Sequence, residues 1–450
     1  MDLLNFLKTN VIVATGCTEP IAVAYAVSLA YHALFQKKIT IDANNTFKFS
    51  NEVPAIRLEN LKSIKIEVDQ NVYKNAYSAI IPGTNGLKGI DVAAALALYL
   101  NPMNKLNLFK NIHTLKLDKI KQILNKDLIE VSYKEENIKD YLLSIDITLK
   151  YQIHDEERTS QVKVRKYHNN IVEINVDGEN LYNNLNQEYE KENTLSMNLK
   201  EILKSVDMAS ESILEEVNIG ILMNKRIAEE ALTNQYGLNI AKSLKKIFIE
   251  NESFNSILSE IRIKVAAAGD ARMGGSNLPV MTTSGSGNMG LTAILPIVIM
   301  GERKGISKNE IQRAVLLSHI ITSIADKYLG HLSVLCGAAI KAGFGVAAGI
   351  TYLLDGSQIQ IHTAINLLAA NNAGFLCDGA KPGCALKIST AAGIATECAL
   401  MALNNQKIGF ENGIVFENSE NTLEGIGNLC KSIYPLNKSI IELIKRSNKN

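Results

Sequence analysis

Three cysteines in the C-terminal half of the chain are the residues best suited to metal chemistry. Cys377 and Cys384 enclose a polar loop in LCDGAKPGC, a spacing that lets both thiolates face one metal centre. Cys336 lies in a separate Gly- and Ala-rich segment, LCGAAIKAG, and has to reach them through folding. Three thiolates at one site suit an iron–sulfur cluster in which one iron has no protein ligand. Such an iron acts as a Lewis acid rather than as an electron store.

Spacing alone leaves two other interpretations of these cysteines open. One is a zinc site with three cysteines and a fourth ligand that the sequence does not reveal. The other is three ordinary buried thiols, because cysteine is among the residue types most often buried. His331, in HLSVLC, is the one histidine near these segments and a further ligand candidate, although a core or surface position is the usual one for a lone histidine.

A glycine-rich turn, SGSGNMG at residues 284–290, is the second candidate site. Its glycines match G-x-G-x-x-G, but a dinucleotide site needs a strand, a helix and then a second strand. Here the following helix contains Pro296 and leads into another helix. We therefore predict a turn whose N–H groups bind an anion such as a substrate carboxylate, with a tight turn between packed helices as the alternative. The predicted substrate-binding residues are Ser284, Gly285, Ser286, Gly287 and Asn288.

The motif GCTEP near the N-terminus is the third candidate site. Thr18 suits the N-cap of the following helix, and Pro20 suits its first turn. Cys17 then lies just before a helix N-terminus, where the helix dipole favours a thiolate. On local grounds a small buried cysteine explains the residue equally well.

Lysines accompany the cysteine segments. Lys381 lies inside the loop between Cys377 and Cys384, and Lys341 and Lys387 lie close to the cysteines in sequence. A cationic iron centre lowers the pKa of a neighbouring lysine, which can then act as a base or bind a carboxylate. A solvated lysine is the ordinary alternative.

Two more cysteines are poor ligand candidates. Residues 384–401 read as one helix, so Cys398 lies roughly 21 Å along the axis from Cys384 at about 1.5 Å per residue. That separation is too large for one cluster. Cys430 lies further on without a partner motif. We expect both to be structural thiols.

Four blocks of the sequence resemble one protein family. In chain order they are ATGCTEPIAVAYA, TTSGSGNMGLTAILP, SVLCGAAIKAGFGVAAGITYLL and LCDGAKPGCALKISTAA. The chain resembles the L-cysteine desulfidases, which are related to the alpha chain of iron–sulfur L-serine dehydratases. The resemblance implies a 4Fe-4S cluster held by Cys336, Cys377 and Cys384. Some serine dehydratases end in a cysteine that reaches the cluster, whereas this chain ends KRSNKN, so the fourth iron is expected to be open.

The resemblance also implies an activity, the β-elimination of L-cysteine to hydrogen sulfide, pyruvate and ammonia. L-Serine dehydration by the same chemistry is the close alternative. Where serine dehydratases have a serine-rich motif with a histidine, this chain has Cys17, Thr18 and Glu19, as the desulfidases do. Cys17 and Lys381 are the predicted catalytic residues, Cys17 as a proton-transfer group or an extra cluster contact. Thr18 and Glu19 are predicted to bind substrate.

Two function classes outside that pair stay open. A non-catalytic iron–sulfur redox sensor or structural metal protein would prefer four protein ligands. A pyridoxal-phosphate lyase would need a Schiff-base lysine, with SGSGNMG as its phosphate-binding turn.

Composition limits the partners. The 450 residues include 47 Lys and Arg against 46 Asp and Glu, which excludes a nucleic-acid or anionic-membrane footprint. Six cysteines are too few for a disulfide framework, and no convincing signal peptide is evident, so we expect a cytoplasmic protein. VLCGAAIKAGFGVAAGITYLL is long enough to cross a membrane but is rich in Gly and Ala and contains Lys341, which favours a packed core helix. The expected partner is a small amino-acid substrate, and a homo-oligomer is compatible with the sequence.

The pattern of the chain predicts an α+β fold. Residues 1–35 read as helix, and alternating β-branched segments between residues 36 and 195 predict a mainly antiparallel sheet. Residues 196–450 are almost continuously helical, with capping signals such as Ser307 and Glu310. We therefore predict a mostly helical catalytic domain from residues 1–35 and 196–450, with a small α+β domain inserted at 36–195.

Overall fold

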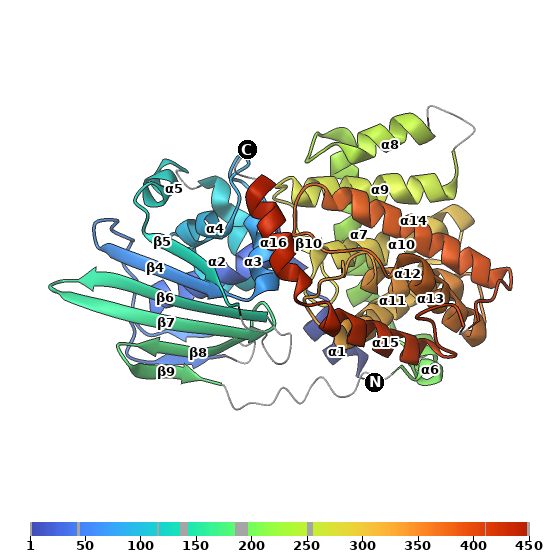
Figure 1. Cartoon of the computed structure of the whole chain (residues 1–450), viewed down its shortest axis with the longest axis horizontal. Coiled ribbons are helices and arrows are strands. Elements are labelled where there is room, and N and C mark those ends of the chain that lie inside the picture. Colours follow the sequence, from blue (N-terminus) through green and yellow to red (C-terminus); the bar gives the residue numbers. More distant parts are fainter. Residues whose placement is uncertain are drawn as a thin grey trace. The chain divides into compact units, whose positions relative to one another are not determined.

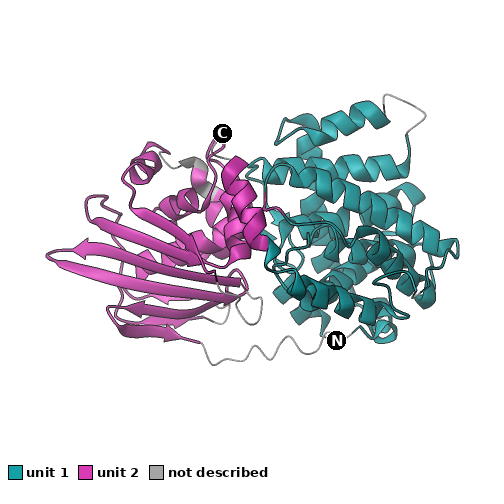
Figure 2. Ribbon diagram, viewed as in Figure 1, with its two compact units in different colours: residues 1–14, 191–377, 381–436 teal, residues 15–190, 378–380, 437–450 magenta. Residues whose placement is uncertain are grey.

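The chain forms two compact units, which Figure 2 shows in different colours. The helical unit comprises residues 1–14, 191–377 and 381–436, and the sheet unit comprises residues 15–190, 378–380 and 437–450. This is a computed structural model, and it describes residues 2–42, 46–114, 117–135, 143–184, 197–249, 255–409 and 411–447.

The helical unit is built around α12 (Lys341–Leu353), which contacts α10, α11, α13 and α14 (Figure 1). All but one of the residues of α12 are buried, and its small residues let the neighbouring helices approach closely. This explains the membrane-like composition that the sequence shows here. The other helices are α1 (Leu3–Asn10), α6 (Leu199–Asp207), α7 (Glu211–Thr233), α8 (Ile240–Phe248), α9 (Ile257–Met273), α10 (Gly287–Lys304), α11 (Lys308–Leu329), α13 (Gln358–Asn372), α14 (Cys384–Leu403) and α15 (Ser419–Ser432).

Local signals in the sequence set several helix boundaries in this unit. Ser307 and Glu310 form the predicted capping box, with each side chain bonded to the other's backbone N–H. Helix α10 begins at Gly287 and carries Pro296 inside it. Two short strands, β1 (Val13–Ala14) and β10 (Val280–Met281), pair antiparallel just before the glycine turn.

The sheet unit contains a six-stranded sheet in the order β5-β4-β6-β7-β8-β9. Its strand pairs are antiparallel except β4 with β5, which are parallel. Alternate residues of β4 are buried and exposed, as expected for a sheet with one packed and one solvated face. The strands are β4 (Leu61–Val68), β5 (Ile129–Tyr133), β6 (Leu143–Ile153), β7 (Glu156–Lys166), β8 (Ile171–Val176) and β9 (Glu179–Asn183), and a separate hairpin joins β2 (Ile39–Ile41) to β3 (Phe47–Phe49).

Helix α2 (Thr18–Ala33) packs on β6, β7 and β8 and also contacts α4. We expected residues 1–35 to complete the helical domain, but in the structure only residues 1–14 group with it. The predicted boundary at residue 195 lies outside the described residues. The remaining helices of the sheet unit are α3 (Gln70–Tyr77), α4 (Ile90–Ala97), the 3-10 helix η1 (Pro102–Thr114), α5 (Leu117–Leu124) and most of α16 (Leu436–Ser447).

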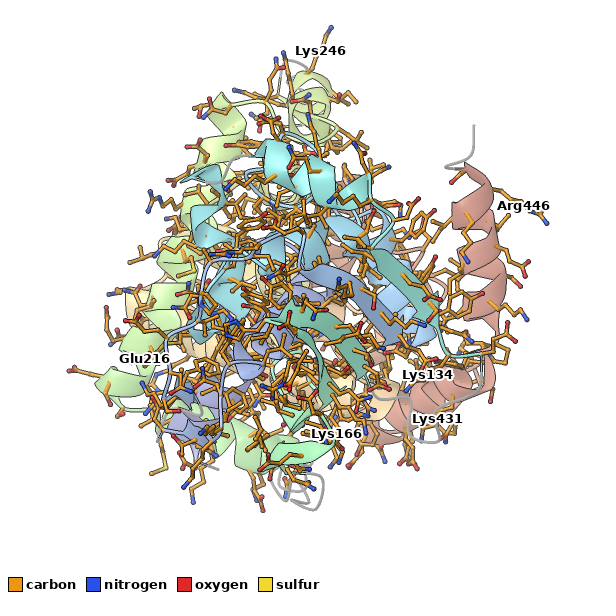
Figure 3. All side chains as sticks on the ribbon, turned by 90° about the vertical axis from the view of Figure 1, so that its left-hand side faces the viewer. Lys134, Lys166, Glu216, Lys246, Lys431 and Arg446 are labelled. Carbon is orange, nitrogen blue, oxygen red and sulfur yellow. The ribbon has the colours of Figure 1, made fainter. Side chains whose placement is uncertain are left out.

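The predicted α+β class is therefore confirmed, with a mostly helical chain and a mainly antiparallel sheet. Charged side chains such as Glu216, Lys246 and Arg446 extend from the ribbon into solvent (Figure 3). Among the described residues, α14 is the one helix long and apolar enough to cross a membrane by length and composition, and 56% of that stretch is buried inside the structure. A core helix of a large domain passes the same test.

Candidate active site

Two of the predicted ligand cysteines lie on neighbouring chain segments in the helical unit. The N–H of Cys336 donates to the carbonyl of Phe375 at 2.7 Å. The N–H of Cys377 donates to the carbonyl of Val334, also at 2.7 Å. These two bonds flank an isolated antiparallel bridge and hold the two segments side by side. A pair of residues far apart in sequence is thus brought together by backbone pairing.

The third cysteine, Cys384, is tied to the same segments. It is the first residue of α14, and its N–H donates to the carbonyl of Lys381 at 2.9 Å. One turn further along α14, the Lys387 Nζ donates to the carbonyl of Leu376 at 2.7 Å. Because Leu376 precedes Cys377, this bond fixes the start of α14 against the Cys377 segment.

The three thiols influence one another electrostatically. Burial, together with the charges of Cys377 and Cys384, raises the pKa of Cys336 to about 12, while the charge of Lys387 opposes the shift. Burial also raises the pKa of Cys384, although the charge of Lys381 partly offsets this. Three thiolates in such a site repel one another, so a cationic centre between them stabilises the ionised forms.

This donor set fits a cluster by its chemistry. Within the part of the chain that the structure describes, no three His, Cys, Asp or Glu side chains are arranged to hold one metal ion. In a 4Fe-4S cluster each cysteine binds a different iron, so the thiols need not converge on one point. All three donors are soft thiols, the ligands that iron–sulfur clusters use.

The glycine turn lies at the N-terminus of α10. Ser286 donates its N–H to Thr283 at 3.0 Å, and Thr283 donates its N–H to Ser286 at 3.2 Å. The two residues between them, Ser284 and Gly285, have φ values of 46° and 73°, as a type I′ turn requires. A serine with its backbone in this left-handed region is strained. Strained backbone conformations of this kind cluster at functional sites.

The internal hydrogen bonds of the turn limit what it can bind. The N–H groups of Ser284 and Ser286 donate to Asn10 and Thr283, so these two do not face an anion. The strand before the turn, β10, has only two residues and pairs with β1 rather than with a parallel sheet. The surroundings of the turn therefore differ from those of a dinucleotide site.

A buried arginine packs against the turn, which the sequence did not reveal. Arg272, in the last turn of α9, is 4% exposed, and its Nη1 donates to the Oδ1 of Asn288 at 2.9 Å. A Cβ on Gly287 would lie 2.2 Å from the Arg272 Nε, so only glycine leaves room for the guanidinium. Arg272 thereby fixes the orientation of a predicted substrate-binding side chain.

Gly287→Ala is expected to destabilise the helical unit by about 2 kcal/mol, because the added methyl group has to displace a buried guanidinium. Thermal unfolding of the apo-protein, followed by circular dichroism, measures the change as a fall of several degrees in the midpoint. Gly374→Ala is the matched control, since its Cβ would meet no atom within 4 Å. Equal midpoints for the two variants would contradict the tight contact at Gly287.

A buried histidine supports the turn from α11. The Nδ1 of His319 lies 2.8 Å from the Oγ1 of Thr283, and Ser284 donates its hydroxyl to Ser323 on the same helix at 2.8 Å. Burial lowers the pKa of His319 to about 3, so this imidazole is neutral at physiological pH. Two side chains of α11 thus hold the strained part of the turn.

Cys17, Thr18 and Glu19 form a buried constellation in the sheet unit. Cys17 is the N-cap of α2, so the prediction of Thr18 as the N-cap was wrong by one residue. The Cys17 thiol donates to the Oε2 of Glu19 at 3.0 Å, and the Thr18 hydroxyl donates to the same oxygen at 3.3 Å. The other carboxylate oxygen accepts a hydrogen bond of 3.0 Å from Asn75.

Glu19 is held in its ionised form. Burial raises the pKa of Glu19, but the charge of His168 and the hydrogen bonds from Cys17 and Asn75 outweigh this, and the pKa lies below its usual value. The carboxylate beside Cys17 is therefore a charged hydrogen-bond acceptor that holds the thiol in one orientation. Neither Asn75 nor His168 belongs to a recognisable motif, which is why the sequence did not identify them.

The other residues singled out in the sequence have structural partners. Cys398 on α14 and Cys430 on α15 are buried, as expected for structural thiols. Asn372 donates to the carbonyl of Ala339 at 2.8 Å, just beyond the Cys336 segment. His331 and Lys341 both pair with a buried carboxylate, which is described below.

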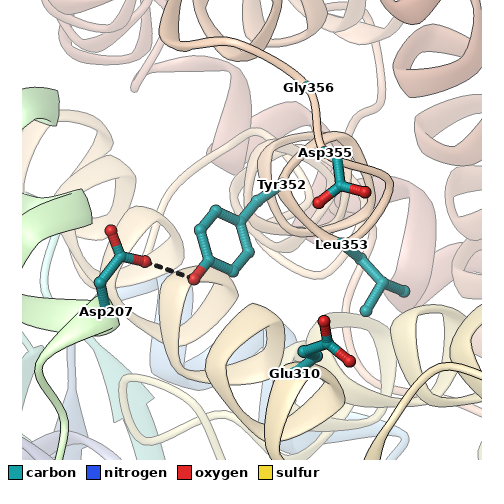
Figure 4. Close-up of a pocket in the computed structure, with 6 residues that line it drawn as sticks. All are labelled: Asp207, Glu310, Tyr352, Leu353, Asp355 and Gly356. Atoms are coloured by element: carbon teal, nitrogen blue, oxygen red, sulfur yellow. Dashed lines mark hydrogen bonds between the residues drawn. The ribbon is translucent and has the colours of Figure 1, made fainter.

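A further cavity in the helical unit, of about 310 Å³, is lined by acidic side chains (Figure 4). Within it the Tyr352 hydroxyl donates to the Oδ1 of Asp207 at 2.6 Å. Its lining contains no cysteine and no residue of the glycine turn: the residues are Asp207, Glu310, Tyr352, Leu353, Asp355 and Gly356. We assign no chemistry to it.

The sequence of this chain matches known proteins. The family model described as the serine dehydratase alpha chain matches residues 125–439. This match spans more than half of the sequence, and the chain belongs to the serine dehydratase alpha chain family.

Relatives in bacteria match over nearly the whole chain. A UPF0597 protein of Clostridium perfringens is 32% identical over 456 residues, which covers 99% of this chain and 98% of the relative. A UPF0597 protein of Caldanaerobacter subterraneus is 35% identical over 433 residues, with 95% and 94% covered. A third, from Desulfotalea psychrophila, is 31% identical over 458 residues.

Proposed function

We propose that this protein is an iron–sulfur-dependent lyase that eliminates the β-substituent of an amino acid, with L-cysteine as its substrate. The observation that carries the proposal is the backbone pairing of the Cys336 and Cys377 segments, together with the hydrogen bond that ties the start of α14, and so Cys384, to them. Membership of the serine dehydratase alpha chain family supports an elimination reaction on an amino acid.

A 4Fe-4S cluster is the proposed cofactor, with these three cysteines as its ligands. When bound, it would supply one iron without a protein ligand, a Lewis acid that withdraws charge from the leaving group. The charges of Lys381 and Lys387 offset part of the rise in the pKa of Cys384 that burial causes, so positive charge complements the thiolates. Sulfide is a soft leaving group well matched to iron.

The glycine turn is proposed to bind the substrate. Arg272 holds the Asn288 side chain at the first turn of α10, where the helix dipole favours a carboxylate. His319 and Ser323 keep the turn in its strained form. These side chains orient the amino acid, which is the main requirement for an elimination that removes a Cα proton.

Cys17 is proposed as the group that transfers the Cα proton. Its thiol donates a hydrogen bond to the ionised Glu19, and this contact fixes the position of the sulfur atom. Lys381 stays a second candidate for proton transfer. A cytoplasmic location, a small-molecule partner alone and a homo-oligomeric state are further proposals that the sequence supports.

L-Serine dehydration is the second candidate function, and the description of the family model favours it. The two activities are distinguished by incubating the anaerobically reconstituted protein with L-cysteine or with L-serine and measuring the pyruvate and sulfide formed. We expect pyruvate and sulfide in equal amounts from L-cysteine, and much slower pyruvate formation from L-serine. Pyruvate from L-serine alone would make the protein a dehydratase, and turnover of neither by the iron-loaded protein would leave a sensor or structural role.

A further inference from the structure

A buried ion pair joins the two helices on either side of Cys336. Asp326 lies in the last turn of α11, and Lys341 is the first residue of α12. The Lys341 Nζ lies 2.8 Å from the Asp326 Oδ1, and the lysine is only 1% exposed. A buried ammonium is costly unless it is fully paired and hydrogen-bonded, so this contact is closely specified.

The same two charges hold the connection between the helices. The Lys341 ammonium also donates to the carbonyls of Gly330 and His331. The Asp326 Oδ2 lies 3.0 Å from the Nδ1 of His331. Burial raises the pKa of Asp326, but the charges of Lys341 and His331 outweigh this and keep it below its usual value. We call Asp326, His331 and Lys341 the buried charge network.

The network reaches Cys336 through one turn of backbone. The carbonyl of Cys336 accepts hydrogen bonds from the N–H groups of Ala339 at 3.0 Å and Ile340 at 2.9 Å, directly before Lys341. The stem of Lys341 lies beside Gly337, where an added Cβ would be 3.5 Å from it. A displacement of the lysine therefore has to move the turn that carries the cysteine.

A buried ion pair of this kind is weak evidence for stability, because an apolar pair of similar volume often serves as well. The directional hydrogen bonds of the ion pair favour one specific arrangement of the chain, which is a different role from adding stability. We propose that the buried charge network is a positioning device that fixes Cys336 in the geometry needed to bind the cluster. This inference rests on the proposed iron–sulfur function. Asp326, His331 and Lys341 are positioning residues and not ligands.

The test variant is Lys341→Met, which keeps most of the buried stem and removes the ammonium. We expect iron in the reconstituted protein to be released to a chelator roughly tenfold faster than in the wild type, the usual range for loss of a residue that orients a ligand. In the apo-protein, iodoacetamide is expected to alkylate Cys336 about tenfold faster, because exposure of the thiol controls its reactivity. Cys398, fully buried on α14, is the internal reference for labelling.

Two further variants separate positioning from stability. Lys308 lies on α11, like Asp326, and forms an exposed ion pair with Glu215. Lys308→Met removes this pair and is expected to leave iron release and Cys336 labelling unchanged. The double variant Asp326→Asn/Lys341→Met removes both charges of the ion pair, so neither an ammonium nor a carboxylate is left buried without its partner. We therefore expect it to recover the thermal midpoint of the wild type. We do not expect it to recover the slow alkylation of Cys336.

The outcomes distinguish this inference from the function on which it rests. Wild-type iron release and wild-type Cys336 labelling in Lys341→Met would overturn the positioning role. A double variant in which labelling recovers together with the midpoint would also overturn it, since the network would then act through stability alone. Failure of the wild type itself to bind iron would instead overturn the proposed cofactor, and the labelling of apo-protein would still decide the role of the network.

Discussion

Replacing Cys384 with serine is expected to remove most of the iron that the reconstituted protein binds, together with all turnover of L-cysteine. Serine keeps the size of the side chain and suits the start of α14, so the helix should form as before. Its hydroxyl does not ionise at neutral pH and is a poor ligand for cluster iron. Iron and acid-labile sulfide per chain, with the visible absorbance of the cluster, measure the effect.

The matched control is Cys398→Ser, which changes another buried cysteine on the same helix. We expect this variant to bind as much iron as the wild type, even where its thermal midpoint falls. Cys336→Ser and Cys377→Ser are expected to behave like Cys384→Ser, because all three thiols are proposed to hold the same cluster. Full iron content in a variant that lacks all three would contradict the ligand assignment and, with it, the proposed function.

The strands were predictable because their periodicity is a local property of the sequence. The alternation in residues 141–155 and 160–167 corresponds to β6 and β7, which pair over their whole length. Helix α2 was also predictable as a helix, but not its placement. Nearly every residue of α2 is buried, so the helix is apolar on all sides and no face indicates which core it joins.

The candidate site was predictable only in its chemistry-bearing residues. Spacing allowed Cys377 and Cys384 to share a site, whereas the position of Cys336 follows from a short backbone bridge without any periodic signal. Arg272, His319 and Asp326 each lie inside a helix, where a single polar residue reads equally well as exposed. Their hydrogen-bond and ion-pair partners are set by tertiary packing, so the sequence alone does not predict which residues pair.

Cys17→Ser is expected to lower the turnover of L-cysteine by roughly 100- to 10,000-fold while leaving the iron content unchanged. The reason is chemical, since a serine hydroxyl beside Glu19 is far less acidic than the thiol and cannot supply a base of matched pKa. Glu19→Gln should lower turnover as well, because the neutral amide lacks the charge that strengthens the hydrogen bond from the Cys17 thiol and holds the sulfur in place.

Exchange of the Cα hydrogen tests this role directly. With substrate deuterated at Cα, the wild type should release deuterium to water. In the Cys17→Ser variant the substrate should keep its deuterium, including the substrate molecules that stay bound to the protein. Cys430→Ser, at a buried thiol on α15, is the control and should exchange the label normally. Loss of iron from Cys17→Ser would make Cys17 a cluster contact. Normal exchange with intact iron would move proton transfer to another group, and Lys381 would be the first to test.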